Sequence, residues 1–287
     1  MACGKTFCWN NKGSKRRKEK AWFSQWITEG YSVKQLNKHS SHSPGKVRGI
    51  ISDWLNHRPL LDIDLSKVIN IICDGTFIEG RRHGIYAVMN AKGHSLVSGV
   101  YDIKEKVREL IIYFNVLKQM GLNPKSATID GKPGISQALE AVWPGIIIQR
   151  CLVHIQRQGL MWCRIKPKRT DAKRLRKLLL TVTGIKTAAQ AKEFINTFKV
   201  WEQRHGKRLM STKVSGWVAS DLVRARSMVI KALPNMFFFL KDSRIPSTSN
   251  AIEGYFSRLK EKYYRHRGLA RRHRVQYFDW YFHLVKR

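Results

Sequence analysis

Three acidic residues, Asp74, Asp130 and Glu253, stand where predicted strands or helices begin or end. From such positions their carboxylates could face one shared point. Three carboxylates can hold two divalent cations, and such a pair can cut and rejoin phosphodiester bonds. Oxygen ligands favour Mg²⁺ or Mn²⁺ over zinc. The pattern therefore predicts a two-cation site that acts on a nucleic-acid backbone.

The chain around these acids is strongly basic. It has 54 Lys and Arg against 20 Asp and Glu in 287 residues, a formal net charge of +34. This charge would repel itself unless a polyanion neutralised it, so the expected partner is nucleic acid. No run approaches the length of an apolar membrane span, and the N-terminus lacks a signal-peptide core. With five cysteines, an odd number, reduced thiols are favoured. We expect a cytoplasmic protein, associated with the nucleoid in a prokaryote.

Residues 1–20 resemble the remnant of a zinc ribbon followed by a basic linker. The run Cys3 to Phe7 matches the last knuckle of such a ribbon, but a partner Cys-x-x-Cys is missing and Cys8 does not restore the spacing. Because a tetrahedral zinc site needs four ligands, we expect no zinc in this chain.

Residues 21–60 show apolar side chains at helical spacing in three short segments, with breaks at Gly30 and at Ser40 to Pro44. Three short helices with a glycine turn fit a helix-turn-helix-like DNA-binding module. Its third helix, which carries Lys46 and Arg48, is the candidate for the major groove. The alternative is a helical bundle that only packs on the next domain.

Residues 61–150 are predicted to form the first part of an α/β core. The apolar run Val68 to Cys73 is typical of a central strand buried on both faces, and Asp74-Gly75 is predicted to end it. Further strands are predicted over 84–89, 95–101, 125–129 and 145–149, and helices over 105–120 and 135–143.

This βββαβαβ order is the ribonuclease H-like plan, with three antiparallel strands at its start. In that plan the first and fourth strands lie side by side, so Asp74 and Asp130 would meet. Each is followed by glycine, which lets the backbone turn and leaves room for a metal and a phosphate.

The rest of the chain reads as helical. Residues 151–245 show no strand pattern and predict an all-helical insertion, and residues 246–287 are predicted to complete the catalytic core and to end in a basic tail. Runs rich in Lys and Arg suit phosphate contacts that position DNA without reading its sequence, although solvated helix faces are the alternative. Aromatic residues among them, Tyr263, Tyr264, Trp280 and Tyr281, are expected to pack. The candidate DNA-binding residues are Lys46, Arg48, Arg157, Arg164, Lys166, Lys168, Arg169, Arg258, Lys260, Arg271 and Arg272.

Four motifs resemble, in type and order, those of DDE transposases of the Mutator-like and related bacterial insertion-sequence superfamily. They are Cys73-Asp74-Gly75-Thr76, Ile129-Asp130-Gly131, Gln149 to His154, and Ser247 to Gly254. The resemblance covers about residues 60 to 270. It implies a ribonuclease H-like fold with a helical insertion, and Asp74, Asp130 and Glu253 as catalytic ligands of two Mg²⁺ or Mn²⁺ ions. It also implies that Cys151 and His154 are a signature pair near the active site.

The activity implied by this resemblance is cleavage at transposon ends, in which one metal activates water. The freed 3′-hydroxyl then attacks target DNA, and no covalent enzyme intermediate forms. The partners would be double-stranded DNA and further copies of the chain, in a homodimer or higher oligomer. The departure from the family is the incomplete zinc ribbon, which bears on autonomous recognition of the element's ends.

Other interpretations remain open at this point. The chain could be a decayed or domesticated transposase that binds DNA as a regulator, or a ribonuclease H-like structure-specific nuclease. Glu253 could be the capping-box partner of Asn250, and the two Asp-Gly pairs could be plain strand-end turns. Cys151 and His154 could be a buried thiol and a core histidine.

Overall fold

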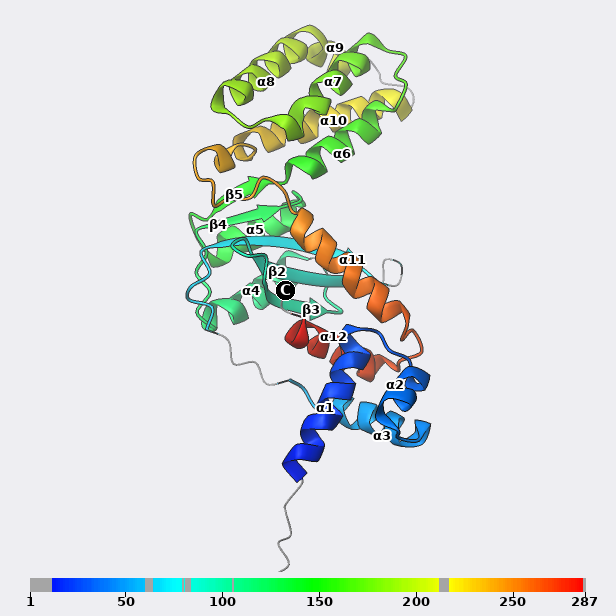
Figure 1. Ribbon diagram of the computed structural model, residues 1–287. Helices are drawn as coiled ribbons and strands as arrows, with labels where there is room; N and C mark the ends of the chain where they lie inside the picture. Colours follow the sequence, from blue (N-terminus) through cyan, green and yellow to red (C-terminus); the bar gives the residue numbers. More distant parts are fainter. Residues whose placement is uncertain are drawn as a thin grey trace, which may run out of the picture. The chain divides into compact units, whose positions relative to one another are not determined.

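A computed structural model describes residues 12–59, 64–78, 80, 84–104, 106–211 and 217–285 (Figure 1). The chain divides into two compact units. The first comprises residues 1–62, 99–102 and 256–286, and the second comprises residues 63–98 and 103–255. The predicted ribbon knuckle at Cys3 to Phe7 lies outside the described residues. Within the described part of the chain, no helix combines the length and apolar composition that crossing a membrane requires.

The N-terminal part of the first unit contains the three helices that the sequence predicts. They are α1 (Lys12–Thr28), α2 (Val33–Ser40) and α3 (Pro44–Leu55). Ser32 and Ser43 cap α2 and α3, because their side chains accept hydrogen bonds from the backbone N–H groups three residues later. The basic run Lys15 to Lys20 lies inside α1.

Aromatic side chains form the core of this unit, where α12 (Arg271–Leu284) joins α1 and α3. The ring of Phe23 lies 5.8 Å from that of Trp54 and 5.3 Å from that of Trp280. The Trp280 indole N–H is shared between two backbone carbonyls, and the shorter contact is with His57 O at 2.9 Å. Packing was predicted for four aromatic residues of the C-terminal part: Tyr263, Trp280 and Tyr281 are buried, while Tyr264 is 40% exposed.

A mixed five-stranded sheet in the order β3-β2-β1-β4-β5 belongs to the second unit, apart from the end of β3, which is assigned to the first. Its strands are β1 (Asn70–Phe77), β2 (Gly84–Asn90), β3 (Leu96–Tyr101), β4 (Ser126–Ile129) and β5 (Ile147–Arg150). Strand β1 pairs with β2 in antiparallel fashion and with β4 in parallel, and β4 is parallel to β5. Helices α4 (Val107–Gln119) and α5 (Pro133–Val142) pack against each other in the same unit. The predicted order of strands and helices is confirmed.

The prediction that β1 ends at Asp74-Gly75 was wrong. The antiparallel ladder with β2 runs on through Asp74 and Gly75 as far as Phe77, which pairs with Gly84. On the other side of β1, the parallel ladder with β4 has its last pair at Ile72 and Thr128. Asp74 therefore lies where the parallel partner stops, although its own strand continues.

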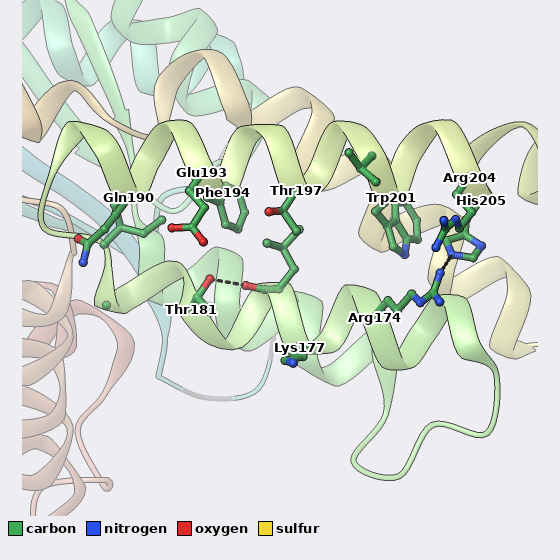
Figure 2. A pocket seen from close by; sticks show the side chains of 14 residues that line it. Arg174, Lys177, Thr181, Gln190, Glu193, Phe194, Thr197, Trp201, Arg204 and His205 are labelled. Carbon is green, nitrogen blue, oxygen red and sulfur yellow. Dashed lines mark hydrogen bonds between the residues drawn. The ribbon is translucent and has the colours of Figure 1, made fainter.

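Helices follow β5 until the chain returns to the sheet. They are α6 (Leu152–Cys163), α7 (Thr170–Thr181), α8 (Ala188–Trp201), α9 (Lys207–Ser211) and α10 (Trp217–Ala232), with a π-helical segment at Glu202–Gly206 and short 3₁₀ turns at Val182–Gly184, Leu233–Asn235 and Phe238–Leu240. They enclose an apolar core that includes Leu175, Leu179, Phe194 and Leu222. A groove of about 640 Å³ runs between α7 and α8, with Phe194 and Trp201 among its lining residues (Figure 2). Helix α11 (Asn250–Tyr264) comes next in the chain.

Candidate metal-binding active site

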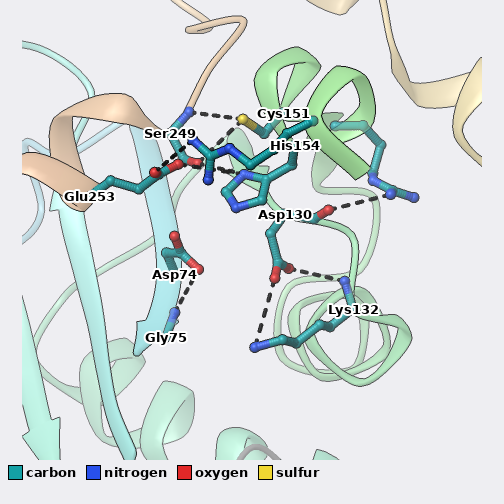
Figure 3. Close-up of polar contacts among 10 residues, drawn as sticks. Asp74, Gly75, Asp130, Lys132, Cys151, His154, Ser249 and Glu253 are labelled. Carbon is teal, nitrogen blue, oxygen red and sulfur yellow. Dashed lines mark hydrogen bonds and ion pairs between the residues drawn. The ribbon is translucent and has the colours of Figure 1, made fainter. Parts of the chain in front are cut away.

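Asp74 and Asp130 extend from neighbouring parallel strands. Each stands two residues beyond a partner in the last pair of the β1–β4 ladder, Ile72 and Thr128, so the two backbones reach the same level of the sheet. Asp74 is 5% exposed, and its Oδ1 accepts a hydrogen bond from Gly75 N–H at 2.8 Å. The Asp130 carboxylate faces Lys132: its Oδ1 accepts from the Lys132 backbone N–H at 3.0 Å, and its Oδ2 lies 3.8 Å from Nζ (Figure 3).

The pKa of Asp74 reflects its burial and the nearby charge of Asp130. Burial raises the pKa of Asp74 to about 7, and the negative charge of Asp130 acts in the same direction. The Gly75 N–H and the nearby His154 and Lys132 lower it only in part. A carboxylate that is buried beside another acid gains from a cation that offsets both the desolvation and the repulsion.

Glu253 comes from the first turns of α11. Its backbone N–H donates to Ser249 O at 3.2 Å, so Ser249 precedes the first turn and Asn250 is already helical. This removes the three-residue spacing on which the capping-box interpretation rested. The Glu253 carboxylate lies instead beside two basic side chains, with Oε2 at 3.3 Å from Arg157 Nη2 and Oε1 at 3.6 Å from His154 Nδ1.

The segment that precedes α11 is fixed to β4 and to the start of α6. Thr128 Oγ1 donates to Pro246 O at 2.8 Å, and Leu152 N–H donates to Ser247 O at 2.9 Å. Both the N–H and the hydroxyl of Ser249 donate to Cys151 Sγ at 3.3 Å. Cys151 and Ser249 are fully buried. Cys151 therefore helps to place the helix that carries Glu253.

His154 lies closer to the centre of the site than the sequence indicated. Ligand atoms of Asp74, His154 and Glu253 lie within 4.8 Å of one another. Asp130 is not in this group of three, because its carboxylate faces Lys132. Contact with the Cys151 thiol raises the pKa of His154, as do the carboxylates of Asp74 and Glu253. The sequence placed His154 near the site but did not indicate that it would approach Asp74.

Gly131 and Arg150 support the Asp130 loop. Gly131 has φ of +96°, a left-handed conformation that favours glycine, and a Cβ there would collide with the Arg150 guanidinium. Arg150 Nη2 donates to Asp130 O at 3.3 Å, and burial lowers the pKa of Arg150. Gly131 therefore leaves room for Arg150, a role that the sequence did not indicate.

The residues at this site fit a divalent cation. Asp74 and Glu253 could supply carboxylate oxygens, Asp130 could supply another from the adjacent strand end, and His154 could add an imidazole nitrogen. Carboxylates suit Mg²⁺ and Mn²⁺, and a single imidazole is compatible with Mn²⁺. The pKa of Asp74 is raised first by burial and then by the charge of Asp130, and a bound cation would offset both effects.

Comparison with known proteins identifies the family of this chain. Residues 77–262 match the family described as Transposase, Mutator family. The chain belongs to the Mutator family of transposases. The family match contains Asp130, Cys151, His154 and Glu253, and it begins just after Asp74.

The chain is also similar to the transposase for insertion sequence element ISRM3 of Rhizobium meliloti (strain 1021). The two are 25% identical over 217 residues, which take in 73% of this chain and 50% of that protein. The chain therefore spans about half the length of this relative.

The predicted phosphate contacts in the second unit lie on α6 and after it. Lys166 and Lys168 follow α6 and are exposed. Arg157 pairs with Glu253, Arg164 with Asp221, and Arg169 with Asp171 at 2.7 Å. These three arginines would have to share their charge between an acid and a phosphate.

The candidates in the first unit fall into two groups. Lys46 Nζ lies 3.6 Å from Glu19 Oε1, and Arg271 Nη2 lies 2.9 Å from Asp102 Oδ2. The others are Arg48, Arg258 and Arg272, which are exposed, and Lys260, which is half-buried. Their placement on helix surfaces is compatible with phosphate contact.

Proposed function

We propose that this chain is a DDE transposase that cleaves DNA at transposon ends and transfers the cut strands into target DNA, with two Mg²⁺ or Mn²⁺ ions as cofactors. The observation that carries the proposal is the placement of Asp74, Asp130 and Glu253. Asp74 stands on β1 and Asp130 directly follows β4, the parallel neighbour of β1, and Glu253 stands on a helix that the buried Cys151–Ser249 contact holds beside them. The mixed sheet and the helices between β5 and α11 support a ribonuclease H-like core with an insertion.

Asp74, Asp130 and Glu253 would hold the cations. When bound, the cations supply a nucleophilic oxygen at neutral pH and stabilise negative charge on the attacked phosphate. The Lys132 ammonium, 3.8 Å from Asp130 Oδ2, is a positive charge that a cation could replace. Arg157 lies at the rim, 61% exposed beside Glu253, and is well placed to orient a phosphate that enters the site.

We assign a different role to each segment of the chain. Residues 21–60 would form a helix-turn-helix-like module that contacts DNA through α3, residues 61–150 and 246–287 the catalytic core, and residues 151–245 an insertion that adds phosphate contacts. Residues 1–20 would be a ribbon remnant and linker. The protein would work as a dimer or higher oligomer on double-stranded DNA, at the nucleoid of a prokaryote.

The test uses the DNA that flanks the gene. The purified full chain is incubated with that DNA and Mn²⁺, and new 3′-hydroxyl ends are mapped by sequencing. We expect ends at one fixed position within terminal inverted repeats. They should be lost in Asp130→Asn and retained in Asp242→Asn, which changes a half-buried acid paired with Arg244. Cleavage of equal strength by Asp130→Asn would remove Asp130 from the site. Cuts at branched DNA only would favour a structure-specific nuclease.

A further inference from the structure

We propose that His154 is itself a ligand of a divalent cation, together with Asp74, and that Cys151 and Ser249 hold its imidazole in the tautomer that permits this. The inference rests on the proposed function, because it concerns the same site. It adds a nitrogen ligand to a set that the sequence predicts as carboxylates alone.

The tautomer follows from the hydrogen bonds around Ser249. The Ser249 backbone N–H can only donate, so Cys151 Sγ, at 3.3 Å, acts as an acceptor. The Ser249 hydroxyl also donates to Cys151 Sγ, which leaves the lone pairs of Oγ to accept from His154 Nδ1 at 3.3 Å. The His154 proton then resides on Nδ1, and Nε2 carries a lone pair.

The orientation of the ring makes the lone pair of Nε2 available to a cation. Nδ1 faces Ser249 and also lies 3.6 Å from Glu253 Oε1. Figure 3 shows the imidazole between Ser249 and Asp74, with its second nitrogen on the side of Asp74, and ligand atoms of His154 and Asp74 lie within 4.8 Å of each other. Histidines that bind metals commonly donate their other ring N–H to a neighbouring oxygen, which fixes the ring and raises its basicity. His154 has this arrangement before any cation is added.

The contact that fixes this tautomer is buried. Ser249 Oγ and Glu253 Oε1 both face Nδ1, so a proton on this nitrogen serves both contacts and Nε2 keeps its lone pair. The chain from Cys151 through Ser249 to His154 consists of two fully buried residues and one half-buried residue that faces the acids. Cys151 and Ser249 are therefore positioning residues for the His154 ligand.

The experiment uses the full chain and Mn²⁺ alone, without DNA. Pulsed electron paramagnetic resonance detects nitrogen coupled directly to bound Mn²⁺, and we expect this coupling in the wild-type protein. Replacing ¹⁴N-histidine by ¹⁵N-histidine should change the coupling pattern. This comparison needs no variant, so it does not depend on how a variant folds.

Variants then identify the residue. His154→Gln should bind Mn²⁺ at least tenfold more weakly and show no nitrogen coupling, whereas His94→Gln, an exposed turn residue of the same unit, should match the wild type. Ser249→Ala should weaken Mn²⁺ binding by about 10- to 100-fold, the usual effect of removing a partner of a metal-bound histidine.

The outcomes separate this inference from the proposed function. Mn²⁺ that binds the wild type with no nitrogen coupling would overturn the inference and leave a carboxylate site in place. Coupling that persists in His154→Gln would also overturn it. No Mn²⁺ binding to the wild type, at concentrations that support cleavage by related enzymes, would count against the proposed function as well.

Discussion

Replacement of Asp74 by Asn should make the metal-free protein more stable at neutral pH. Asp74 is 5% exposed and burial raises its pKa from 3.8 to about 7. The unfolded chain loses this proton near pH 4 and the folded protein near pH 7, so between these values the folded state binds more protons. Stability must then fall as the pH rises through this window. Asn has nearly the same shape and no charge, so the variant lacks this fall.

The magnitude follows from the size of the shift. One pKa unit corresponds to about 1.4 kcal/mol, so a shift of about three units removes about 4 kcal/mol between pH 4 and pH 7. At pH 8 without divalent cations, Asp74→Asn should therefore melt roughly 10 °C above the wild type, and the two should converge near pH 4. A divalent cation should narrow this difference, because it stabilises the wild type and leaves the variant unchanged. The gain is about 2.7 kcal/mol at a concentration 100-fold above the dissociation constant and about 4.1 kcal/mol at 1,000-fold, where the two proteins should melt at nearly the same temperature.

The assay is thermal unfolding of both proteins from pH 4 to pH 8, once with a chelator and once with Mn²⁺. Comparing the two proteins at each pH cancels the titration of the other carboxylates. Asp242→Asn, which removes a half-buried acid paired with Arg244, is the control, and Mn²⁺ should not narrow its difference from the wild type. If the difference in melting temperature between wild type and Asp74→Asn were the same at every pH, the claim that burial and the charge of Asp130 raise the pKa of Asp74 would be refuted.

Three further predictions follow from the same structure. Gly131→Ala should lower the melting temperature more than Gly145→Ala, because both glycines have positive φ (+96° and +82°) but only at Gly131 would the new Cβ meet Arg150; equal losses would exclude the steric role of Gly131. Glu253→Gln should leave the melting temperature nearly unchanged and reduce strand transfer by orders of magnitude. The control Glu261→Gln, on the same helix, should keep strand-transfer activity. An active Glu253→Gln protein would remove Glu253 from the set of metal ligands. DNA affinity, measured by fluorescence anisotropy, should fall about a thousandfold or more between 50 and 200 mM salt if six or more phosphates are contacted, and an affinity insensitive to salt would mean that the basic surface does not bind DNA.

The sequence predicted the elements of the core better than their ends. Apolar runs and helical spacing were enough to predict β1 to β5, α4, α5 and the three N-terminal helices. The end of β1 was misplaced because an Asp-Gly pair is a turn signal, whereas here the backbone of both residues pairs with Ala87 and Tyr86 of β2. A local signal could not reveal that the neighbouring strand continues the ladder.

The sequence likewise predicted only part of the candidate site. Strand order alone brought Asp74 and Asp130 together, since parallel neighbours end at the same edge. The contact of Cys151 with Ser249 joins residues that are 98 positions apart, and the collision that excludes a side chain at Gly131 depends on where Arg150 folds back. Such contacts depend on three-dimensional packing, and spacing in a single sequence does not encode them.

The most direct test of the central claim is strand joining in vitro. A duplex that carries the terminal sequence of the element, with a free 3′-hydroxyl, is incubated with supercoiled plasmid, Mn²⁺ and either wild-type protein or one of Asp74→Asn, Asp130→Asn and Glu253→Gln. The account predicts joined products with the wild type, none after chelation, and none with any of the three variants, all of which should still bind the duplex. Joining by the wild type in the presence of a chelator, or by any of the three variants at the wild-type rate, would contradict it.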